Sequence, residues 1–359
     1  MPFLLPGFWQ KRRSTGNIMN MIKSWFKQYG NLVLIVLMMI GLTGFLTGGL
    51  LLILELNKEL PQTNREVLYF NQLTGFGQNA KMSVNPIAVM VENATEIRPQ
   101  FGLGAASVVY EALVEGGITR FMAVYDYRDQ VEKIGPVRSA RPYFLDWAAE
   151  YQPAFFHVGG SPQALEAING YSIIDINEMG VNEIYFSRGS RQEWPHNVYT
   201  GASLWQDISD LKNRQITFKS WRFKPAEEIY CPPAGQKIII DFSYGNYQVR
   251  WDYDCITGRY LRINGGSEHL DEAGRQLTSE KVIIQFVKSW LIDTERLGLQ
   301  TVGQGKAIIF QNGRVAEGGW QKAAEGSRTE FLNTTGETVE FLPGKTWIEV
   351  VPPLTNISY

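Results

Sequence analysis

The sequence has 359 residues, of which 34 are basic and 36 acidic, and 44% of its residues are hydrophobic. Five of the basic residues precede Glu55 and no acidic residue does, so 29 basic side chains face 36 acidic ones in the remainder, a net charge of −7. The negative charge of residues 55–359 disfavours binding to nucleic acid or to anionic lipid, so we expect no nucleic-acid partner. Any anion must bind to a local cluster of positive charge.

The first predicted element is an uncharged apolar helix over residues 32–54. At roughly 1.5 Å per residue it is about 34 Å long, which is enough to cross a bilayer. It is longer than the core of a typical signal peptide, and no A-x-A-like cleavage site follows it. We therefore predict a retained transmembrane anchor.

The flanks of this helix predict its orientation. Basic residues precede it, and no acidic residue occurs before Glu55. The positive-inside rule then keeps residues 1–31 in the cytoplasm and places the bulk of the chain outside the cell membrane, as a single-pass protein. Met19 or Met21 could be the true start instead of Met1, which leaves the same topology. The basic residues are Lys11, Arg12, Arg13, Lys23 and Lys27.

The remaining chain divides by its pattern into linkers and domains. Residues 55–84 are polar and predict a linker, and residues 85–222 alternate short apolar runs with helical segments, which is typical of an α/β-type mixed domain. Residues 223–236, rich in proline, predict a second linker. Residues 237–359 consist of strand-like runs separated by turns and predict a smaller β-rich domain. We expect the α+β class overall.

A β-hairpin is predicted over residues 108–127, with its turn at the glycine pair 116–117. A two-residue turn places Glu115 opposite Ile118. Because side chains alternate along a strand, Glu111, Glu115 and Arg120 then share one face. This face is either a solvated cross-strand ion pair or the polar floor of a site.

A helix is predicted to begin at Pro142, because apolar residues follow at helical spacing. Arg138, Ser139 and Arg141 lie at its start, which is already electropositive. Arginines suit this position if an anion lies between them and the helix. The alternatives are that each arginine pairs with a carboxylate elsewhere, or that the helix is a simple surface helix.

A second helix start follows at residues 156–168, where Ser161 is the predicted N-cap and Pro162 the first helical residue. Gly160 lets the backbone approach a ligand closely, so this start also suits an anion. The alternative is an ordinary strand–turn–helix connection. His157 precedes Ser161 by four residues, but no G-x-S-x-G motif supports a nucleophile and base.

The other candidate groups are His196 and Asn197, in a predicted loop with aromatic neighbours. They and His157 are candidate hydrogen-bond donors to a ligand, with a structural role of each histidine as the alternative. Cys231 and Cys255 flank one predicted hairpin, and a disulfide between them stays open. There is no P-loop, H-E-x-x-H motif or dinucleotide fingerprint, and we expect no metal site and no cofactor.

Several longer motifs resemble the first domain of the YerB-like "putative lipoprotein" family. They are NPIAVMVEN, RPQFGLGAASVVYEALVEGGITRFMAVY, EKIGPVRSARPYFLDWAAEY, HVGGSPQAL and PHNVYT. The match continues through YDCITGRYLRINGGSEHLDEAGRQLTSEKVIIQFV, GKAIIFQNGRVAEGGW and LPGKTWIEVVP, and so spans about Asn85 to Pro353.

The resemblance implies a membrane-attached, extracytoplasmic bacterial envelope protein of two domains, and it implies no particular reaction. Members anchored by lipid need a cysteine after the signal segment. None occurs before Cys231 here, so the transmembrane helix must replace the lipid.

The order of anchor, strand pair, arginine-bearing turn and helices is also similar to that of the LytR-CpsA-Psr ligases. Those enzymes hold a polyprenyl pyrophosphate with arginines, to which Arg138 and Arg141 would correspond. This sequence lacks the acidic residue that closely follows the arginine in those ligases. The likeness is one of pattern, which does not establish function.

We favour an envelope protein that binds an anionic wall or lipid-linked ligand, and we name no catalytic residue. One alternative is a metal-assisted glycopolymer transferase with Glu111 or Glu115 as base. The other is a non-catalytic scaffold that docks a wall-synthesis protein. The expected ligand-binding residues are Arg120, Arg138, Ser139, Arg141, His157, Gly160, Ser161, His196 and Asn197, above a floor of Glu111 and Glu115.

Overall fold

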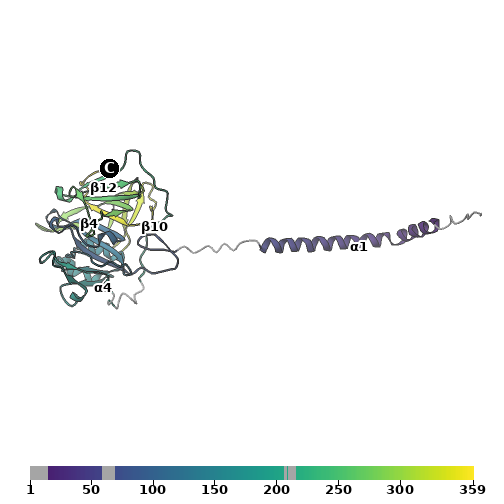
Figure 1. Ribbon diagram of the computed structural model, residues 1–359, viewed down its shortest axis with the longest axis horizontal. Coiled ribbons are helices and arrows are strands. Elements are labelled where there is room, and N and C mark those ends of the chain that lie inside the picture. Colours follow the sequence, from purple (N-terminus) through teal and green to yellow (C-terminus); the bar gives the residue numbers. More distant parts are fainter. Residues whose placement is uncertain (1–14, 59–68, 206–207, 209–215) are drawn as a thin grey trace, which may run out of the picture. The chain divides into compact units, whose positions relative to one another are not determined.

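The computed structural model describes residues 15–58, 69–205, 208 and 216–359. The chain divides into two compact units, Met1–Val67 and Leu68–Tyr359 (Figure 1). Residues 1–14 of the expected cytoplasmic segment, with three of its basic residues, and residues 59–68 of the expected linker lie outside the described residues.

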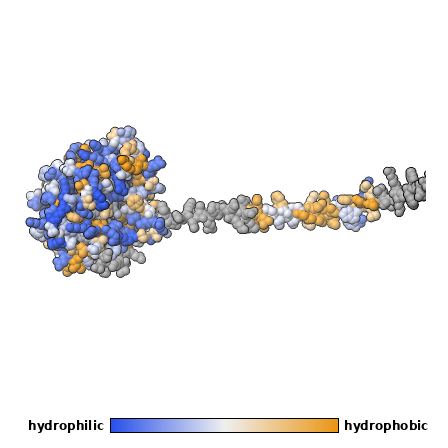
Figure 2. All heavy atoms as spheres, viewed as in Figure 1, coloured by the Kyte–Doolittle hydropathy of each residue, from blue (hydrophilic) through white to orange (hydrophobic). Residues whose placement is uncertain are grey.

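The first unit contains the helix α1 (Thr15–Lys58), which extends beyond the predicted span of 32–54 at both ends. Within it, Ile18–Leu52 is apolar and long enough to cross a membrane, by length and composition. Hydrophobic side chains cover much of α1, whereas the visible face of the second unit is mainly hydrophilic (Figure 2). The predicted apolar N-terminal helix is confirmed, and a helix with this covering is suited to a bilayer.

Ten strands of the described chain form one mixed sheet in the second unit. Strands from both expected domains take part, because β23 lies between β16 and β4 and runs parallel to both. In spatial order the strands are β21 (Glu330–Asn333), β20 (Arg314–Lys322), β19 (Gly303–Gln311), β16 (Lys281–Phe286), β23 (Thr346–Val351), β4 (Val108–Leu113), β5 (Thr119–Asp126), β3 (Pro86–Glu92), β6 (Ala154–His157) and β7 (Ile174–Asn177).

The central sheet is covered on both faces. The helices α2 (Pro142–Ala149) and α3 (Pro162–Ala167) cover one face, where Phe144, Trp147 and Ala164 join its core. A second sheet covers the other face with side chains such as Ile240 and Trp251. Burial on both faces explains why the central strands are almost continuously apolar in sequence, without a polar alternation.

The second sheet consists of strands from the C-terminal part of the described chain. Its order is β14 (Ser267–Glu268), β13 (Arg259–Asn264), β12 (Gln248–Asp254), β11 (Lys237–Asp241) and β24 (Asn356–Ser358), with β15 (Thr278–Ser279) also paired to β13. The predicted α+β class, with a β-rich C-terminal part, is confirmed.

Short strand pairs and one further helix, α4 (Ala202–Trp205), complete the described elements. The pairs are β1 (Tyr69–Phe70) with β2 (Gly77–Gln78), β8 (Ser187–Arg188) with β9 (Val198–Tyr199), β10 (Arg222–Phe223) with β22 (Glu340–Phe341), and β17 (Ser289–Leu291) with β18 (Leu297–Leu299).

The first predicted linker needs correction where the structure describes it. Leu73 and Val84, in the first, are fully buried in the core under α2, so residues 69–84 belong to the second unit. In the second, Cys231 forms a disulfide with Cys255, and the side-chain amide of Asn312 donates to the carbonyl of Glu228. Apolar burial therefore holds residues 69–84, which only their polar composition marked as a linker, whereas residues 223–236 stay a predicted linker.

The register of the predicted hairpin is wrong by one residue. The loop has three residues, Glu115–Gly117, instead of two, so the N–H of Val114 donates to the carbonyl of Ile118. A shift of one residue moves side chains to opposite faces. Glu111 therefore faces the second sheet, whereas Arg120 faces the side of α2.

Candidate functional site

Most of the predicted site residues line one cavity of about 420 Å³. The loop and start of the β4–β5 hairpin, the segment before α2 and the segment before α3 each contribute. β3 adds a glutamate, and the turn of the β17–β18 hairpin adds a glutamate and an arginine. The charged and small polar residues of its lining are Glu92, Glu115, Arg120, Arg138, Ser139, Arg141, Gly160, Ser161, Glu295 and Arg296.

Arg141 is held at the start of α2 by a bidentate ion pair. Its Nη2 donates to Oε2 of Glu115 at 2.8 Å, and its Nε contacts the same carboxylate. Its Nη1 donates to the carbonyl of Ala140 at 2.7 Å. Burial raises the pKa of Glu115, but the hydrogen bond and charge of Arg141 more than offset it, so the pKa lies below its usual value. The alternative of a carboxylate partner thus applies to Arg141.

Arg138 also has a carboxylate neighbour. Its Nε lies 3.2 Å from Oε1 of Glu92, and its Nη1 donates to the carbonyl of Pro195 at 3.4 Å. The other oxygen of Glu92 lies 2.8 Å from Nδ1 of His196. Glu92 is therefore shared between an arginine and a histidine, and His196 reaches the cavity through this carboxylate, without lining it.

Arg120 differs from the other two arginines. It is almost fully buried, and its Nη1 donates to the carbonyl of Ser139 at 2.8 Å. Among the described residues, no carboxylate oxygen lies within ion-pair distance of its guanidinium. Burial and, after it, the nearby charge of Arg141 lower its pKa to about 10. A buried guanidinium without a counter-ion is an unusual feature, because charges inside proteins are normally paired.

The two predicted helix starts lie beside each other. A parallel bridge joins Ala140 to Gly160, and the N–H of Ser161 donates to the carbonyl of Ala140. Ser161 caps α3 as predicted, since its hydroxyl accepts from the N–H of Ala164 at 3.3 Å. The helix α3 itself has only six residues.

His157 and Asn197 lie outside the lining of this cavity. The ring of His157 is fully buried, with Nε2 2.7 Å from Oδ1 of Asp175 and Nδ1 2.6 Å from the carbonyl of Gly159. It therefore anchors the turn behind Gly160. The side-chain oxygen of Asn197 accepts a hydrogen bond from Arg188.

Glu111 is not part of the floor of this cavity. It is fully buried on the opposite face of the sheet, where its Oε2 contacts Nη2 of Arg262 at 2.5 Å and its Oε1 accepts from Thr119 at 2.6 Å. Arg262 was not predicted as a partner of Glu111, because it comes from β13, 151 residues further along the chain, and no local motif marks it.

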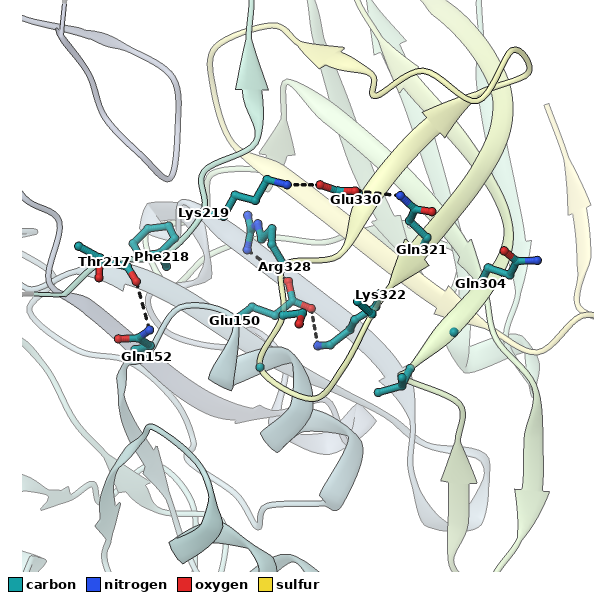
Figure 3. A pocket seen from close by; sticks show the side chains of 15 residues that line it. Glu150, Gln152, Thr217, Phe218, Lys219, Gln304, Gln321, Lys322, Arg328 and Glu330 are labelled. Carbon is teal, nitrogen blue, oxygen red and sulfur yellow. Dashed lines mark hydrogen bonds and ion pairs between the residues drawn. The ribbon is translucent and has the colours of Figure 1, made fainter.

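A second cavity, of about 870 Å³, was also missed. In it Glu150, just after α2, lies between Lys322 and Arg328 (Figure 3). Its carboxylate accepts from Nζ of Lys322 at 2.7 Å, and the guanidinium of Arg328 stacks 3.7 Å from the ring centre of Trp221. Two buried cations thus share one carboxylate, and Nε and Nη2 of Arg328 have no hydrogen-bond partner among the described residues. These residues lie far apart in the sequence, so local patterns do not reveal the cluster.

The comparisons with known proteins agree with this architecture. The family described as "Protein of unknown function (DUF3048)" matches with its N-terminal domain over residues 73–215 and its C-terminal domain over residues 238–348. The "Putative lipoprotein YerB" of Bacillus subtilis (strain 168) is 32% identical over 298 residues, which make up 80% of this chain and 87% of the relative.

A crystal structure of the YerB protein from Bacillus subtilis is also similar, with a TM-score of 0.70 and 30% sequence identity. The match covers 81% of this chain, the same share as Leu68–Tyr359, and all of the solved chain. The solved chain is matched over its whole length, so it folded and crystallised without a counterpart of the remaining fifth of this chain.

The fold defines a two-part α+β protein, and its apolar N-terminal helix, together with the lipoprotein relative, suggests association with a membrane. The chain belongs to the DUF3048 family, the YerB-like lipoprotein family, as the resemblance implied.

Proposed function

We propose that this protein is a single-pass envelope protein with a cytoplasmic N-terminus, and that its extracytoplasmic unit binds a phosphate-type anion in the arginine cavity. The ligand would come from the cell wall or from a lipid-linked precursor. Four arginines line this cavity against three glutamates. The observation that carries the proposal is Arg120, whose buried charge has no carboxylate partner among the described residues.

The chemistry of the lining fits a phosphate. Guanidinium groups bind phosphate oxygens in a fixed, bidentate geometry, and a site that excludes water strengthens the interaction. Arg138 shares the carboxylate of Glu92 with His196, so it can direct part of its donors to a ligand, whereas Arg141 holds Glu115 bidentately. Arg120 supplies a charge without a carboxylate partner among the described residues. The net charge of the chain supports a local site over general attraction of anions.

The experiment is a thermal unfolding series of residues 68–359 with pyrophosphate, teichoic acid fragments and muropeptides, each with and without Mg²⁺. A ligand at 100 times its Kd stabilises the folded state by about 2.7 kcal/mol, which shifts Tm by several degrees. The shift should vanish in Arg138→Ala/Arg141→Ala. Arg250→Ala is the matched control, because Arg250 forms an ion pair with Asp252 outside the cavity. A shift that survives the double substitution would refute the site.

The topology is tested by a cysteine at Leu354, an almost fully exposed position. A membrane-impermeant maleimide should label Leu354→Cys on intact cells. Labelling only after lysis would contradict the proposed orientation.

The transferase and scaffold alternatives have less support. Glu111, one of the two proposed bases, lies buried on the other side of the sheet, and Glu115 is paired to Arg141. A scaffold that acts through the C-terminal part would bind its partner unchanged in Arg138→Ala/Arg141→Ala.

A further inference from the structure

The hairpin β17–β18 presents apolar side chains beside the arginine cavity. Trp290, Leu291 and Ile292 are exposed to 53%, 68% and 41%. The turn that follows them supplies Glu295 and Arg296 to the lining of the cavity. Ile292 is directly joined to that lining, since its N–H donates to the carbonyl of Arg296 at 2.8 Å. Exposed apolar residues that cluster beside a polar site are more typical of a binding surface than isolated exposed apolar residues are.

The register of the hairpin decides which side chains accompany Arg296. Trp290 pairs with Gly298, and Leu291 with Leu297. Because side chains alternate, Trp290, Ile292 and Arg296 share one face, and Leu291 lies on the other. The indole of Trp290 lies flat on Gly298, where any side chain would displace it, since a Cβ there would fall 2.3 Å from the ring. An apolar strip thus leads along one face of the hairpin to the cavity.

Two further exposed apolar side chains lie near the glycine pair before α3. Leu165 of α3 is 39% exposed and contacts Gly160, which lines the cavity. Met179 is 68% exposed, and its sulfur lies against Gly159. The hairpin turn contacts α3 directly, because Nη1 of Arg296 donates to Oε1 of Gln163 at 2.9 Å. Exposed apolar side chains of the hairpin and of α3 therefore border a charged cavity.

We infer that the ligand of the arginine cavity is an amphiphile, a phosphate or pyrophosphate ester of a long hydrocarbon, whose chain lies along the Trp290–Ile292 face of the hairpin. The inference rests on the proposed function, because it takes the arginines to hold the phosphate. The charge of the cavity matches the head of such a molecule, and the strip matches its chain. A free anion or a soluble glycan phosphate would leave the strip without a role.

The test compares two probes that share a head group, inorganic pyrophosphate and farnesyl pyrophosphate, in calorimetric titrations of residues 68–359. Burial of hydrocarbon on the hairpin should make the Kd of farnesyl pyrophosphate at least tenfold lower than that of pyrophosphate. Trp290→Ser/Ile292→Ser should bring the two values together and leave the Kd of pyrophosphate unchanged. Leu291→Ser is the matched control, because Leu291 is as exposed but lies on the other face, and it should keep the tenfold difference.

The outcomes separate the two proposals. Equal affinity for both probes in the native unit would overturn the inference and leave the proposed function standing, whereas binding of neither would overturn both. If Leu291→Ser and the double variant lost the same affinity for farnesyl pyrophosphate, the hydrocarbon chain could not be assigned to the Trp290–Ile292 face. Binding of the unit to phosphatidylcholine vesicles without any pyrophosphate, abolished by Trp290→Ser/Ile292→Ser, would assign the strip to the bilayer and also overturn the inference.

Discussion

Arg262 and two glutamates form a charge network between the sheets that can be tested by two substitutions with opposite expectations. Nη2 of Arg262 contacts Oε2 of Glu111 at 2.5 Å, and its Nη1 contacts Oε1 of Glu349 at 2.9 Å, with all three side chains fully buried. Burial, and then the charge of Glu111, raise the pKa of Glu349 well above its usual value. A raised pKa favours the protonated form of Glu349, and we predict that its side chain is uncharged at pH 7.

Glu349→Gln should then be nearly neutral. Glutamine is also uncharged, and its Oε1 can accept from Trp251 and Arg262 as the carboxyl oxygen does. We expect the free energy of unfolding to change by less than about 1 kcal/mol. Arg262→Met removes the cation and leaves two buried carboxyl groups, at a cost of about 3–5 kcal/mol. For a unit of this size that corresponds to a Tm lower by roughly 5–8 °C.

Differential scanning calorimetry of residues 68–359 at pH 7 and pH 5 measures both substitutions. In Arg262→Met the folded state holds carboxyl groups of raised pKa and binds more protons than the unfolded state, so its stability falls as pH rises above about 4.5. The difference in stability between Arg262→Met and the native unit should therefore be smaller at pH 5 than at pH 7. If Glu349→Gln proved as destabilising as Arg262→Met, Glu349 would have to be ionised, and the reasoning would be refuted.

Two further predictions concern stability outside this network. Lys281 is fully buried, donates to the carbonyls of Leu342 and Gly344, and burial lowers its pKa to about 7. In the unfolded state this lysine keeps its proton up to about pH 10.5, so above pH 7 the unfolded state binds more protons than the folded state. The free energy of unfolding should therefore rise by roughly 2 kcal/mol between pH 7 and pH 9. In urea titrations, Lys281→Met should not show this rise. Reduction of the Cys231–Cys255 disulfide, or its replacement by serines, should lower the stability by about 3 kcal/mol, and an unchanged Tm in dithiothreitol would contradict this.

Local features of the structure could be predicted from the sequence. The apolar helix follows from length and composition alone, and the start of α2 at Pro142 and the cap at Ser161 follow from the rules for helix ends. The convergence of Arg138, Arg141 and the segment before α3 was expected, because these residues lie close together in the sequence. Their carboxylate partners were open alternatives, and one of them, Glu92, was not among the residues singled out.

Non-local features could not be predicted in the same way. One additional residue in the loop at Glu115–Gly117 moved Glu111 to the other face, and nothing in the Gly-Gly pair distinguishes a loop of two residues from one of three. The contact with Arg262 joins residues 151 positions apart. Strand pairing across such separations depends on the packing of the whole sheet, which periodicity does not report.

The position of β23 has a consequence for the assembly of the chain. Among the described strands of the central sheet, β23 is the last in sequence, yet it lies in the middle and joins β16 to β4. Until it is synthesised, both neighbours keep an unpaired edge, a state prone to wrong association. The sheet therefore closes as a late, long-range event, which predicts slow folding and a need for protection of the nascent chain, and a chain that stopped before Thr346 would have two half-sheets with nothing to join them.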